Sequence, residues 1–342
     1  MLKWYDRAGK NDDVVISTRI RLARNFSDYK FADRMSEEEA RTMTKTVADK
    51  FDEEFPDAYR CIYMNECDET KRKAMKEQRI INSTMAKRSS GAVLLSPDEG
   101  TSIMLNSDDH VRIQVLANGM NMPVCFKKAN DIDDYIDSQF DYAFDERYGY
   151  KTTFPTNVGS GMRACYSLHL PGLANARKIS GISAELGRFG IKIRPVYGND
   201  ENSYGNFYQI SNQKTLGQSE TEIIKDLDDI VMQIIEQERE QRQYQYENDR
   251  YRTEDVAFKS YGVLKYARKM GLKDAVTLLS EYMSGVALGI LSVDPKNYHG
   301  INRILSDIQP AVLINTSKKA LSPDEVEVLR AEYIRNNLPE LN

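Results

Sequence analysis

The feature that most constrains this chain is a set of arginines placed in or beside apolar, β-rich segments. Arg163 comes directly after a glycine-spaced turn, NVGSGM, and Arg112 follows the polar segment NSDDHV. A solvated surface normally mixes arginine with lysine and glutamate, but the planar guanidinium binds phosphate oxygens bidentately and stays charged at any working pH. The other members of the set are Arg19, Arg21, Arg24 and Arg194. The pattern predicts a fold that gathers arginines from distant segments around a polyphosphate.

Composition narrows the class of protein. The chain has 342 residues, 41% of them hydrophobic, which is enough for one large core and a smaller one. The net charge of −5 argues against a protein that coats nucleic acid, so we expect no direct nucleic-acid partner. No segment approaches the roughly twenty apolar residues of a membrane span, and the N-terminus has no apolar signal segment. We expect a cytoplasmic protein with no membrane partner.

The four cysteines show no spacing typical of metal ligands. Cys61 and Cys67 are too far apart for a CxxC pair, and the histidines are distant from this pair. Free thiols and no metal site built from protein ligands are the prediction.

The periodicity of the chain predicts an α+β fold, an antiparallel sheet flanked by helices. Residues 36–56 have helical spacing behind Ser36, with Glu39 three places on, which is a capping-box pattern. Further helices are expected at 131–145 and 173–189. Short β-type segments separated by turn residues are GAVLLS, TSIMLN, VRIQVLA, CYSLHLPG and IKIRPVYG, all between residues 91 and 198.

The residue pattern changes from β-type segments to helical periodicity near Ser219. An amphipathic helix leads into a polar, glutamine-rich tract at 237–252, which is the best candidate for a linker, and residues 253–342 are almost wholly helical in pattern. We therefore expect a catalytic domain at 14–245 and a helical C-terminal domain at 246–342. The apolar stripes of the second domain exceed what its own packing needs, so we expect it to form a homodimer contact and to serve regulation.

The segment NSDDHVR carries two adjacent carboxylates. Side chains that follow one another in a strand or its turn point to opposite faces, so Asp108 and Asp109 are expected to have different roles. His110 has no nucleophile beside it in the sequence and is expected to be structural. The turn NVGSGM lacks the terminal GKS/T of a P-loop and the GxGxxG of a dinucleotide fold, and alone it would indicate only a tight turn before a strand.

Four motifs then resemble the guanidino-phosphotransferases, the creatine kinase and arginine kinase family. NSDDHVR is similar to NEEDHLR, FPTNVGSGMR to CPxNxGTGxR, STRIRLAR to S-S/T-R-V/I-R-x-x-R, and YGNFYQISNQKTLGQSE to GGVYDISNKxRLGxTE. The four occur in the family's order over residues 17–220. The family's small helical N-terminal domain has no counterpart here, and a helical C-terminal segment is added, a layout that resembles the bacterial protein-arginine kinases.

The resemblance implies ATP as cofactor, with Mg²⁺ held on its β- and γ-phosphates mostly by water. Asp108 stands in the place of the family's catalytic glutamate, and Asn199 in the place of a second glutamate of arginine-specific members. An arginine guanidinium is protonated at neutral pH, so an enzyme must hold it with carboxylates and accept a proton as the new bond forms. The residues that the resemblance assigns to ATP are Ser17, Thr18, Arg19, Ile20, Arg21, Arg112, Arg163, Ala164, Cys165, Tyr166, Ser167, Arg194, Pro195, Val196, Tyr197, Gly198 and Asn199.

The layout implies ATP-dependent phosphorylation of arginine side chains in proteins as part of a stress response. The implied partners are protein substrates with exposed arginines, a stress-gene repressor, a zinc-binding activator protein and a chaperone-protease. A chain ending near residue 245 is expected to be monomeric and still to bind ATP.

Departures from the family pattern keep an alternative open. Asp108 is one methylene shorter than glutamate, a misplacement that can cost about a hundredfold in rate, and Asn199 supplies no negative charge. Phe154 replaces a reactive cysteine, and Ile80 is aligned with a histidine that contacts the nucleotide. In the last helix Arg330 of an RDxxRA motif for phosphoarginine is kept, while its first arginine is replaced by Val326. The alternative is a catalytically weakened or inactive nucleotide-binding adaptor of the same fold. A kinase for small guanidino compounds is a third hypothesis, and the missing N-terminal domain disfavours it.

Overall fold

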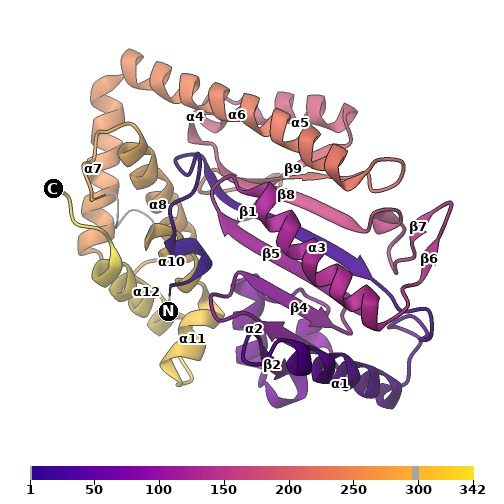
Figure 1. The fold of residues 1–342 in the computed structure, drawn as a ribbon. Helices are drawn as coiled ribbons and strands as arrows, with labels where there is room; N and C mark the ends of the chain where they lie inside the picture. The colour runs from indigo at the N-terminus through magenta and orange to yellow at the C-terminus, as the bar shows by residue number, and fades with distance from the viewer. Residues whose placement is uncertain (1, 295–299) are drawn as a thin grey trace.

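Residues 2–294 and 300–342 are described by the structure, a computed structural model of the chain (Figure 1). Residues 295–299, which fall in the predicted helical domain, lie outside the described residues. The strands are β1 Val15–Arg24, β2 Arg60–Tyr63, β3 Ala92–Leu95, β4 Thr101–Leu105, β5 Val111–Asn118, β6 Phe144–Asp145, β7 Gly149–Tyr150, β8 Met162–His169, β9 Ile191–Pro195 and β10 Phe207–Asn212. The α-helices are α1 Glu37–Glu54, α2 Glu69–Glu77, α3 Met122–Gln139, α4 Pro171–Asn175, α5 Ile179–Arg188, α6 Glu220–Asn248, α7 Arg250–Tyr266, α8 Leu272–Ala287, α10 Gly300–Asp307, α11 Pro310–Ser317 and α12 Pro323–Asn337. Short 3-10 turns are η1 Trp4–Asp6, η2 Met64–Glu66, η3 Met85–Lys87 and η4 Pro155–Asn157.

Eight strands form one antiparallel sheet in the order β2-β3-β4-β5-β1-β8-β10-β9. The central strand β1 lies between β5 and β8, so it has neighbours on both sides. Its side chains alternate, with Ile20 and Leu22 buried on one face and Arg19 and Arg21 on the other. The sheet therefore has an apolar face and a polar face.

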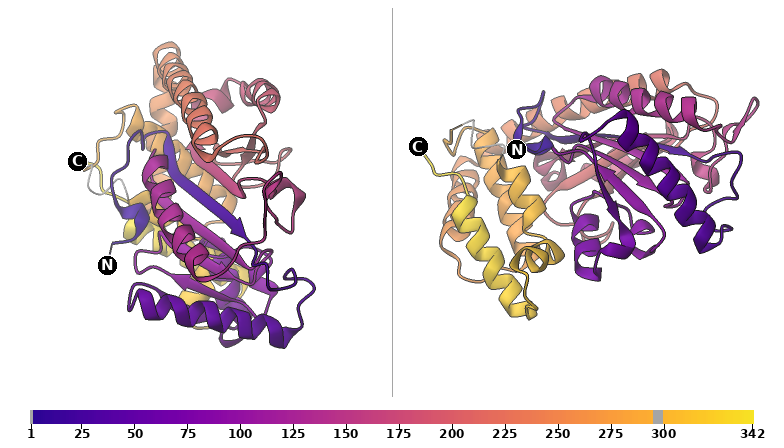
Figure 2. Two further views of the ribbon diagram at one scale, coloured as in Figure 1. Left: turned by 45° about the vertical axis from the view of Figure 1, so that its right-hand side comes forward. Right: turned by 60° about the horizontal axis from the view of Figure 1, so that its bottom comes forward.

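The apolar face is covered by α1, α3 and α6. Phe51 of α1, Ile136 of α3 and Val231 of α6 pack in one core with Ile20 and Leu22. Figure 2 shows the long helices on one side of the sheet and the C-terminal helices, in orange and yellow, beside its end. This core fixes which face of the sheet remains for a site.

The polar face is covered only in part. At its β2–β4 end, α2 and η3 pack Met75 and Met85 against Val93 and Met104. Helices α7, α8, α10 and α12 form a second core around residues such as Leu279 and reach the sheet at Phe207. Between these two covers, the middle of the polar face carries the arginines.

The predicted helix behind Ser36 is confirmed. It is α1, and the Ser36 hydroxyl accepts from the Glu39 backbone N–H at 3.2 Å. The five predicted β segments are also confirmed as β3, β4, β5, β8 and β9.

The bounds of two other predicted helices are wrong. The helix expected at 131–145 is α3, which begins at Met122 and ends at Gln139, and residues 144 and 145 form β6 instead. The helix expected at 173–189 is divided into α4 and α5, with Arg177 in the left-handed region at φ 58° between them.

The tract at 237–252, predicted as a linker, is helical. Helix α6 continues to Asn248, and α7 begins two residues later. Two charged residues of this tract are buried, because Glu238 pairs with Arg242 at 3.1 Å and accepts from the backbone N–H groups of Gly172 and Leu173 at 2.9 Å. The tract is therefore a mostly exposed helix in which Glu238 and Arg242 form one buried ion pair. Among the described residues, no helix has the length and apolar character to span a bilayer.

Candidate functional site

Strand register brings arginines from three strands onto the polar face. Arg21 of β1 lies opposite Arg163 of β8 on one side and Gln114 of β5 on the other. Residues directly opposite each other in an antiparallel pair share a face, and so do residues two apart in a strand. Arg19 and Arg112 therefore lie on the same face as Arg21 and Arg163.

The same reasoning extends the face to β9. Arg194 lies opposite Gln209 of β10, which lies opposite Ser167 of β8, and Ser167 lies opposite Ser17 of β1. We call this surface the arginine face, and it consists of Ser17, Arg19, Arg21, Arg112, Arg163, Cys165, Ser167 and Arg194. The resemblance had assigned each of these residues to ATP.

The arginine face is short of negative charge. The Nε atom of Arg21 is buried and makes no hydrogen bond within the described residues. Burial, reinforced by the neighbouring Arg19 guanidinium, lowers the pKa of Arg21 well below its ordinary value. Burial together with Arg112 and Arg194 also lowers the pKa of Arg163. Cations held this close without counterions form a site that a polyanion would stabilise.

Cys165 lies among these arginines. Its sulfur accepts from Arg19 Nε at 3.4 Å. Burial opposes ionisation of the thiol, but Arg19 and Arg21 outweigh it and the pKa of Cys165 is lowered. The positive charges that favour the thiolate form of Cys165 would also attract a phosphate.

Asp108 lies at one end of the arginine face. Its carboxylate accepts from Arg112 Nη1 at 2.8 Å, from Asn82 Nδ2 at 2.8 Å and from the Thr84 hydroxyl at 2.5 Å. The sequence had not singled out Asn82 or Thr84, because they come from the loop before η3 and carry no periodic signal. Together these three donors fix the direction of the carboxylate.

Asp109 and His110 shape the turn that presents Asp108. Asp109 is buried and accepts from Asn25 Nδ2 and from the Thr153 backbone N–H, both at 2.7 Å. His110 accepts from the Phe26 backbone N–H at 3.0 Å, and its other ring nitrogen lies 2.8 Å from the Lys30 carbonyl oxygen. As predicted, the side chains of Asp108 and Asp109 have different surroundings, and His110 is hydrogen-bonded to the backbone of the neighbouring segment.

The glycine-spaced turn is built for close packing. A Cβ at Gly159 would overlap the Thr215 carbonyl oxygen, one at Gly161 would overlap Arg24 Nη1, and both glycines have positive φ. The turn delivers Arg163, which donates to the Asn212 carbonyl oxygen at 2.9 Å. Its glycines thus serve the backbone, and its arginine is the part that enters the site.

Four residues assigned to ATP have side chains on the other face of the sheet. Ile20 and Ala164 pack in the core, Tyr166 donates to Asp228 at 2.6 Å, and Thr18 donates to the Gly119 carbonyl oxygen at 2.6 Å. Strand alternation is the reason, because each stands next to a residue of the arginine face. Only their backbone is available to a ligand on that face.

Arg24 also lies on the apolar face and not with the other arginines. It pairs with Asp133 at 2.7 Å, donates to the Ala23 and Ser160 carbonyl oxygens at 3.0 Å, and lies 3.5 Å from the centre of the Tyr150 ring. The hypothesis that all six arginines converge is therefore wrong for Arg24, which is a structural cation.

Asn199 is not placed beside Asp108. It lies in the exposed loop between β9 and β10, and its side-chain oxygen accepts from the backbone N–H groups of Asn202 at 2.8 Å and Glu201 at 3.2 Å. This loop is at the Ser17 end of the arginine face, whereas Asp108 is at the other end. Pro195 ends β9, and Gly198 in the same loop has φ +79° and packs tightly against the Asn202 carbonyl oxygen.

Arg79 is a site residue that the sequence analysis missed. It follows α2 with φ 63°, and its Nη1 lies 3.4 Å from the Ser167 hydroxyl. Burial lowers the pKa of its guanidinium. The residue predicted for this place, Ile80, is buried among the methionines under α2 instead. A single residue in the left-handed conformation after a helix changes which side chain faces the site. No sequence pattern predicts this conformation at Arg79.

A cavity of about 260 Å³ opens at the Ser17 end of the arginine face. Arg79, Val196 and Tyr197 line it. The resemblance had assigned residues 195–199 to the nucleotide. Of these, Val196 and Tyr197 line the cavity, whereas Gly198 and Asn199 lie in an exposed turn.

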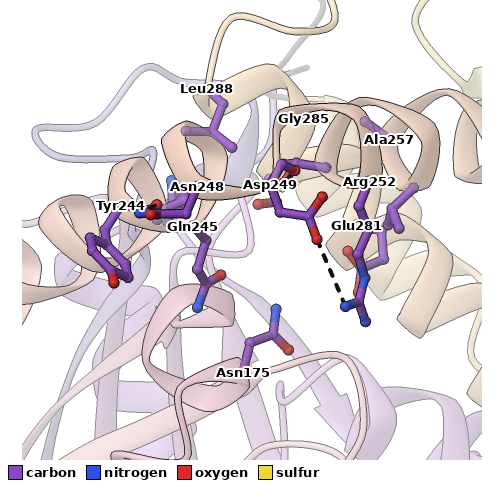
Figure 3. A pocket seen from close by; sticks show the side chains of 14 residues that line it. Asn175, Tyr244, Gln245, Asn248, Asp249, Arg252, Ala257, Glu281, Gly285 and Leu288 are labelled. Carbon is purple, nitrogen blue, oxygen red and sulfur yellow. Dashed lines mark hydrogen bonds and ion pairs between the residues drawn. The ribbon is translucent and has the colours of Figure 1, made fainter.

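A larger cavity lies elsewhere. It has a volume of about 510 Å³ and lies where α6 meets α7, close to α4 and α8 (Figure 3). Asp249 and Arg252 face each other there at 4.0 Å, and Arg242 and Glu281 also line it. Its charges are mixed and it includes no residue of the arginine face, so it is not the candidate site.

Arg330 of the last helix is engaged in packing. It is buried, and it donates to the Ile308 and Met270 carbonyl oxygens at 2.9 and 3.0 Å. Val326 is buried one turn earlier in α12. These contacts fasten α12 to the rest of the C-terminal helices.

Two sequence families match the chain. Residues 40–241 match the family described as ATP:guanido phosphotransferase, C-terminal catalytic domain, and residues 250–342 match the family described as Protein-arginine kinase McsB C-terminal domain. The protein-arginine kinases of Bacillus velezensis and Bacillus subtilis are each 39% identical over 338 residues, which is 98% of this chain and 93% of theirs.

Solved structures show the same fold. A lombricine kinase superposes with a TM-score of 0.60 at 20% identity, over 68% of each chain. A duplicated taurocyamine kinase from Schistosoma mansoni superposes with a TM-score of 0.58 at 23% identity, over 69% of this chain and 34% of that one.

Proposed function

The chain belongs to the ATP:guanido phosphotransferase family, in its protein-arginine kinase branch, and from this premise we propose that it transfers the γ-phosphoryl group of ATP to arginine side chains of proteins. The observation that carries the proposal is the arginine face, where Arg19, Arg21, Arg112 and Arg163 lie together and, among the described residues, the only ion pair that they make is that of Arg112 with Asp108. Phosphoryl transfer asks mostly for positioning and charge neutralisation. The arginine face supplies both for a triphosphate.

A divalent cation fits this site only through the phosphates. The described residues include no group of three or more histidine, cysteine, aspartate or glutamate side chains that could hold a metal. We propose Mg²⁺, bound to β- and γ-phosphate oxygens and water, where it would neutralise charge on the transferred group. The guanidinium groups hold the remaining phosphate oxygens.

Asp108 is the group that we propose to receive the substrate guanidinium. In the structure its carboxylate is occupied by Arg112, Asn82 and Thr84. When phosphates draw the Arg112 guanidinium away from Asp108, Oδ2 keeps Asn82 as its donor and gains room for a new one. That oxygen can then orient the incoming guanidinium and accept its proton as the N–P bond forms.

Detection of phosphoarginine tests this function. The full chain is incubated with ATP, Mg²⁺ and an unfolded protein, and the products are analysed by mass spectrometry under conditions that preserve acid-labile phosphoramidates. Phosphorylated arginines are expected, with none in a reaction of the Arg163→Ala variant. Their absence, with ATP binding retained, would favour the adaptor hypothesis.

One observation favours that second candidate. Asn199, at the position of a second carboxylate, caps its own turn at the far end of the face from Asp108. A protein with one carboxylate near the substrate could bind ATP and transfer slowly or not at all. The same experiment separates the two functions.

We also propose that the chain forms a homodimer through α7. Tyr251, Phe258 and Tyr266 of this helix are 86%, 52% and 73% exposed, and an isologous contact is the commonest way to cover such a surface. Light scattering should give about twice the monomer mass of 39.2 kDa. A Tyr251→Glu, Phe258→Glu double variant should scatter as a monomer, and a monomeric unmodified chain at micromolar concentration would contradict the proposal.

The cellular setting is proposed on the resemblance alone. It comprises a cytoplasmic location, a stress-gene repressor, a zinc-binding activator and a chaperone-protease as partners, and no direct nucleic-acid contact. Isolation of the tagged protein from its own cells after heat shock tests these partners.

A further inference from the structure

The cavity at the Ser17 end of the arginine face has walls from two parts of the chain. Ser17, Arg79 and Tyr197 come from the catalytic sheet and its loops, whereas Leu305 and Ser306 come from α10 in the C-terminal helical region. Its volume is about 260 Å³, and apolar and polar groups are mixed around it. Such a concave, partly apolar site suits a planar heterocycle.

The position of the cavity relates it to the phosphate arginines. Ser17 lies two residues before Arg19 and four before Arg21 on β1, at roughly 3.3 Å per residue. The Arg112 side chain is next to position 23 of β1, across the pairing of Arg112 with Ala23. A nucleotide whose phosphates lie along these arginines toward Asp108 would therefore place its base in the cavity.

Helices α10 and α11 are attached to the catalytic part at three points, two on α10 and one at the start of α11. Asn302 Nδ2 donates to Asn118 Oδ1 at 3.0 Å, and Arg303 Nε donates to Asp6 Oδ1 at 3.1 Å. The Glu77 carboxylate accepts from the backbone N–H groups of Ala311 and Val312, at 2.7 and 3.2 Å, at the start of the next helix. Glu77 stands two residues before Arg79, so one short segment contacts both the C-terminal helices and the cavity.

Resting on the proposed function, we propose that α10 forms one wall of the pocket for the purine base of ATP, so that nucleotide binding and docking of the C-terminal helices stabilise each other. Leu305 offers an apolar surface to the ring, and the Ser306 hydroxyl makes no hydrogen bond within the described residues. Gln309 Nε2 donates to the Leu305 carbonyl oxygen at 2.9 Å, which leaves Oε1 as an acceptor for the exocyclic amine of adenine. Coupling of this kind is reciprocal, because the same free energy links both equilibria.

This proposal reverses one expectation from the sequence. A chain ending near residue 245 lacks α10 and with it Leu305, Ser306 and Gln309, so its pocket for the base would be open on one side. Such a chain should bind ATP more weakly than the full chain, instead of equally well.

The first test fills the cavity in the full chain. Ser306→Trp should raise the Kd of ATP at least about tenfold, the equivalent of 1.4 kcal/mol, and leave the Kd of inorganic tripolyphosphate unchanged, since tripolyphosphate contacts the arginine face alone. Asn315→Trp, on the exposed side of α11, is the matched control and should change neither constant. Unchanged ATP affinity in Ser306→Trp overturns the inference, whereas failure of the unmodified chain to bind tripolyphosphate would overturn the proposed function instead.

A second measurement uses the unmodified protein and does not depend on how the variant folds. Hydrogen exchange of amides in residues 300–317 should slow when ATP is added and should not slow with tripolyphosphate at equal saturation. Equal protection by the two ligands, or none by ATP, would show that α10 does not contact the base.

Discussion

Two arginines three residues apart on β1 have opposite surroundings. Arg24, on the apolar face, has a carboxylate partner in Asp133, two carbonyl acceptors and the face of Tyr150. Arg21, on the polar face, has a buried Nε without a partner and other guanidinium groups as neighbours. The first arginine is satisfied by the protein itself, and the second is left for a ligand to satisfy.

This difference teaches how to tell a structural cation from a functional one. A buried charge lowers stability unless it is paired. If stability alone had been selected, Arg21 would have a carboxylate partner as Arg24 does, or an uncharged residue would stand in its place. The lowered pKa of Arg21 means that the folded state holds its proton less tightly than the unfolded chain does. At neutral pH the charged guanidinium therefore lowers stability, and a bound polyphosphate would restore it.

The largest effect should be the loss of activity when residues of the arginine face are replaced. Arg163→Ala or Arg112→Ala should each lower phosphoryl transfer by about a thousandfold or more, because each removes a charge-assisted contact in a site shielded from water. Steady-state rates and calorimetric ATP affinity measure the effect. Arg60→Ala, at an exposed position of β2, is the control. Near-normal activity and affinity in either variant would remove that arginine from the phosphate site.

The second largest effect should be a loss of stability when Arg24 is replaced. Arg24→Met leaves the Asp133 carboxylate buried and unpaired, which should lower the free energy of unfolding by about 3–5 kcal/mol. Urea unfolding of the variant and the parent gives this difference. A loss below about 1 kcal/mol, the range of an exposed ion pair, would mean that Arg24 is not the structural cation described here.

Asp108 has both a structural partner and a proposed functional one, because it pairs with Arg112 and is proposed to receive the substrate guanidinium. Asp108→Asn should lower transfer by about a hundredfold or more, the usual contribution of a positioned general base, with ATP affinity retained. Asp108→Glu should raise the rate if the shorter side chain is a handicap. Loss of ATP binding in the Asn variant would place this residue with the nucleotide instead.

The smallest effect is a gain in stability. Arg21→Met removes an unpaired buried charge and should raise the free energy of unfolding by about 1 kcal/mol without nucleotide, while ATP no longer stabilises the variant. Thermal unfolding with and without ATP measures both. A variant that is less stable than the parent would show that Arg21 has a structural partner after all, and the contrast with Arg24 would fail.

The sequence by itself determined much of this protein. Alternation along STRIRLAR places Arg19 and Arg21 on one face and Arg24 on the other, because successive strand residues point in opposite directions, and the hypothesis that all six arginines converge overlooked this. The turn before Arg163, the cap at Ser36 and the different roles of Asp108 and Asp109 also follow from local chemistry. These features depend on a few neighbouring residues, and a motif contains all of them.

Only the tertiary structure decided the rest. It placed Thr18, Ile20, Ala164 and Tyr166 on the core face, since which face is buried depends on the helices that cover the sheet. It brought Asn82 and Thr84 to Asp108, Arg79 to Ser167 and α10 to the end of the arginine face, and it made a helix of the tract at 237–252 by pairing Glu238 with Arg242. Contacts between residues far apart in the chain set these positions, and no local pattern records them.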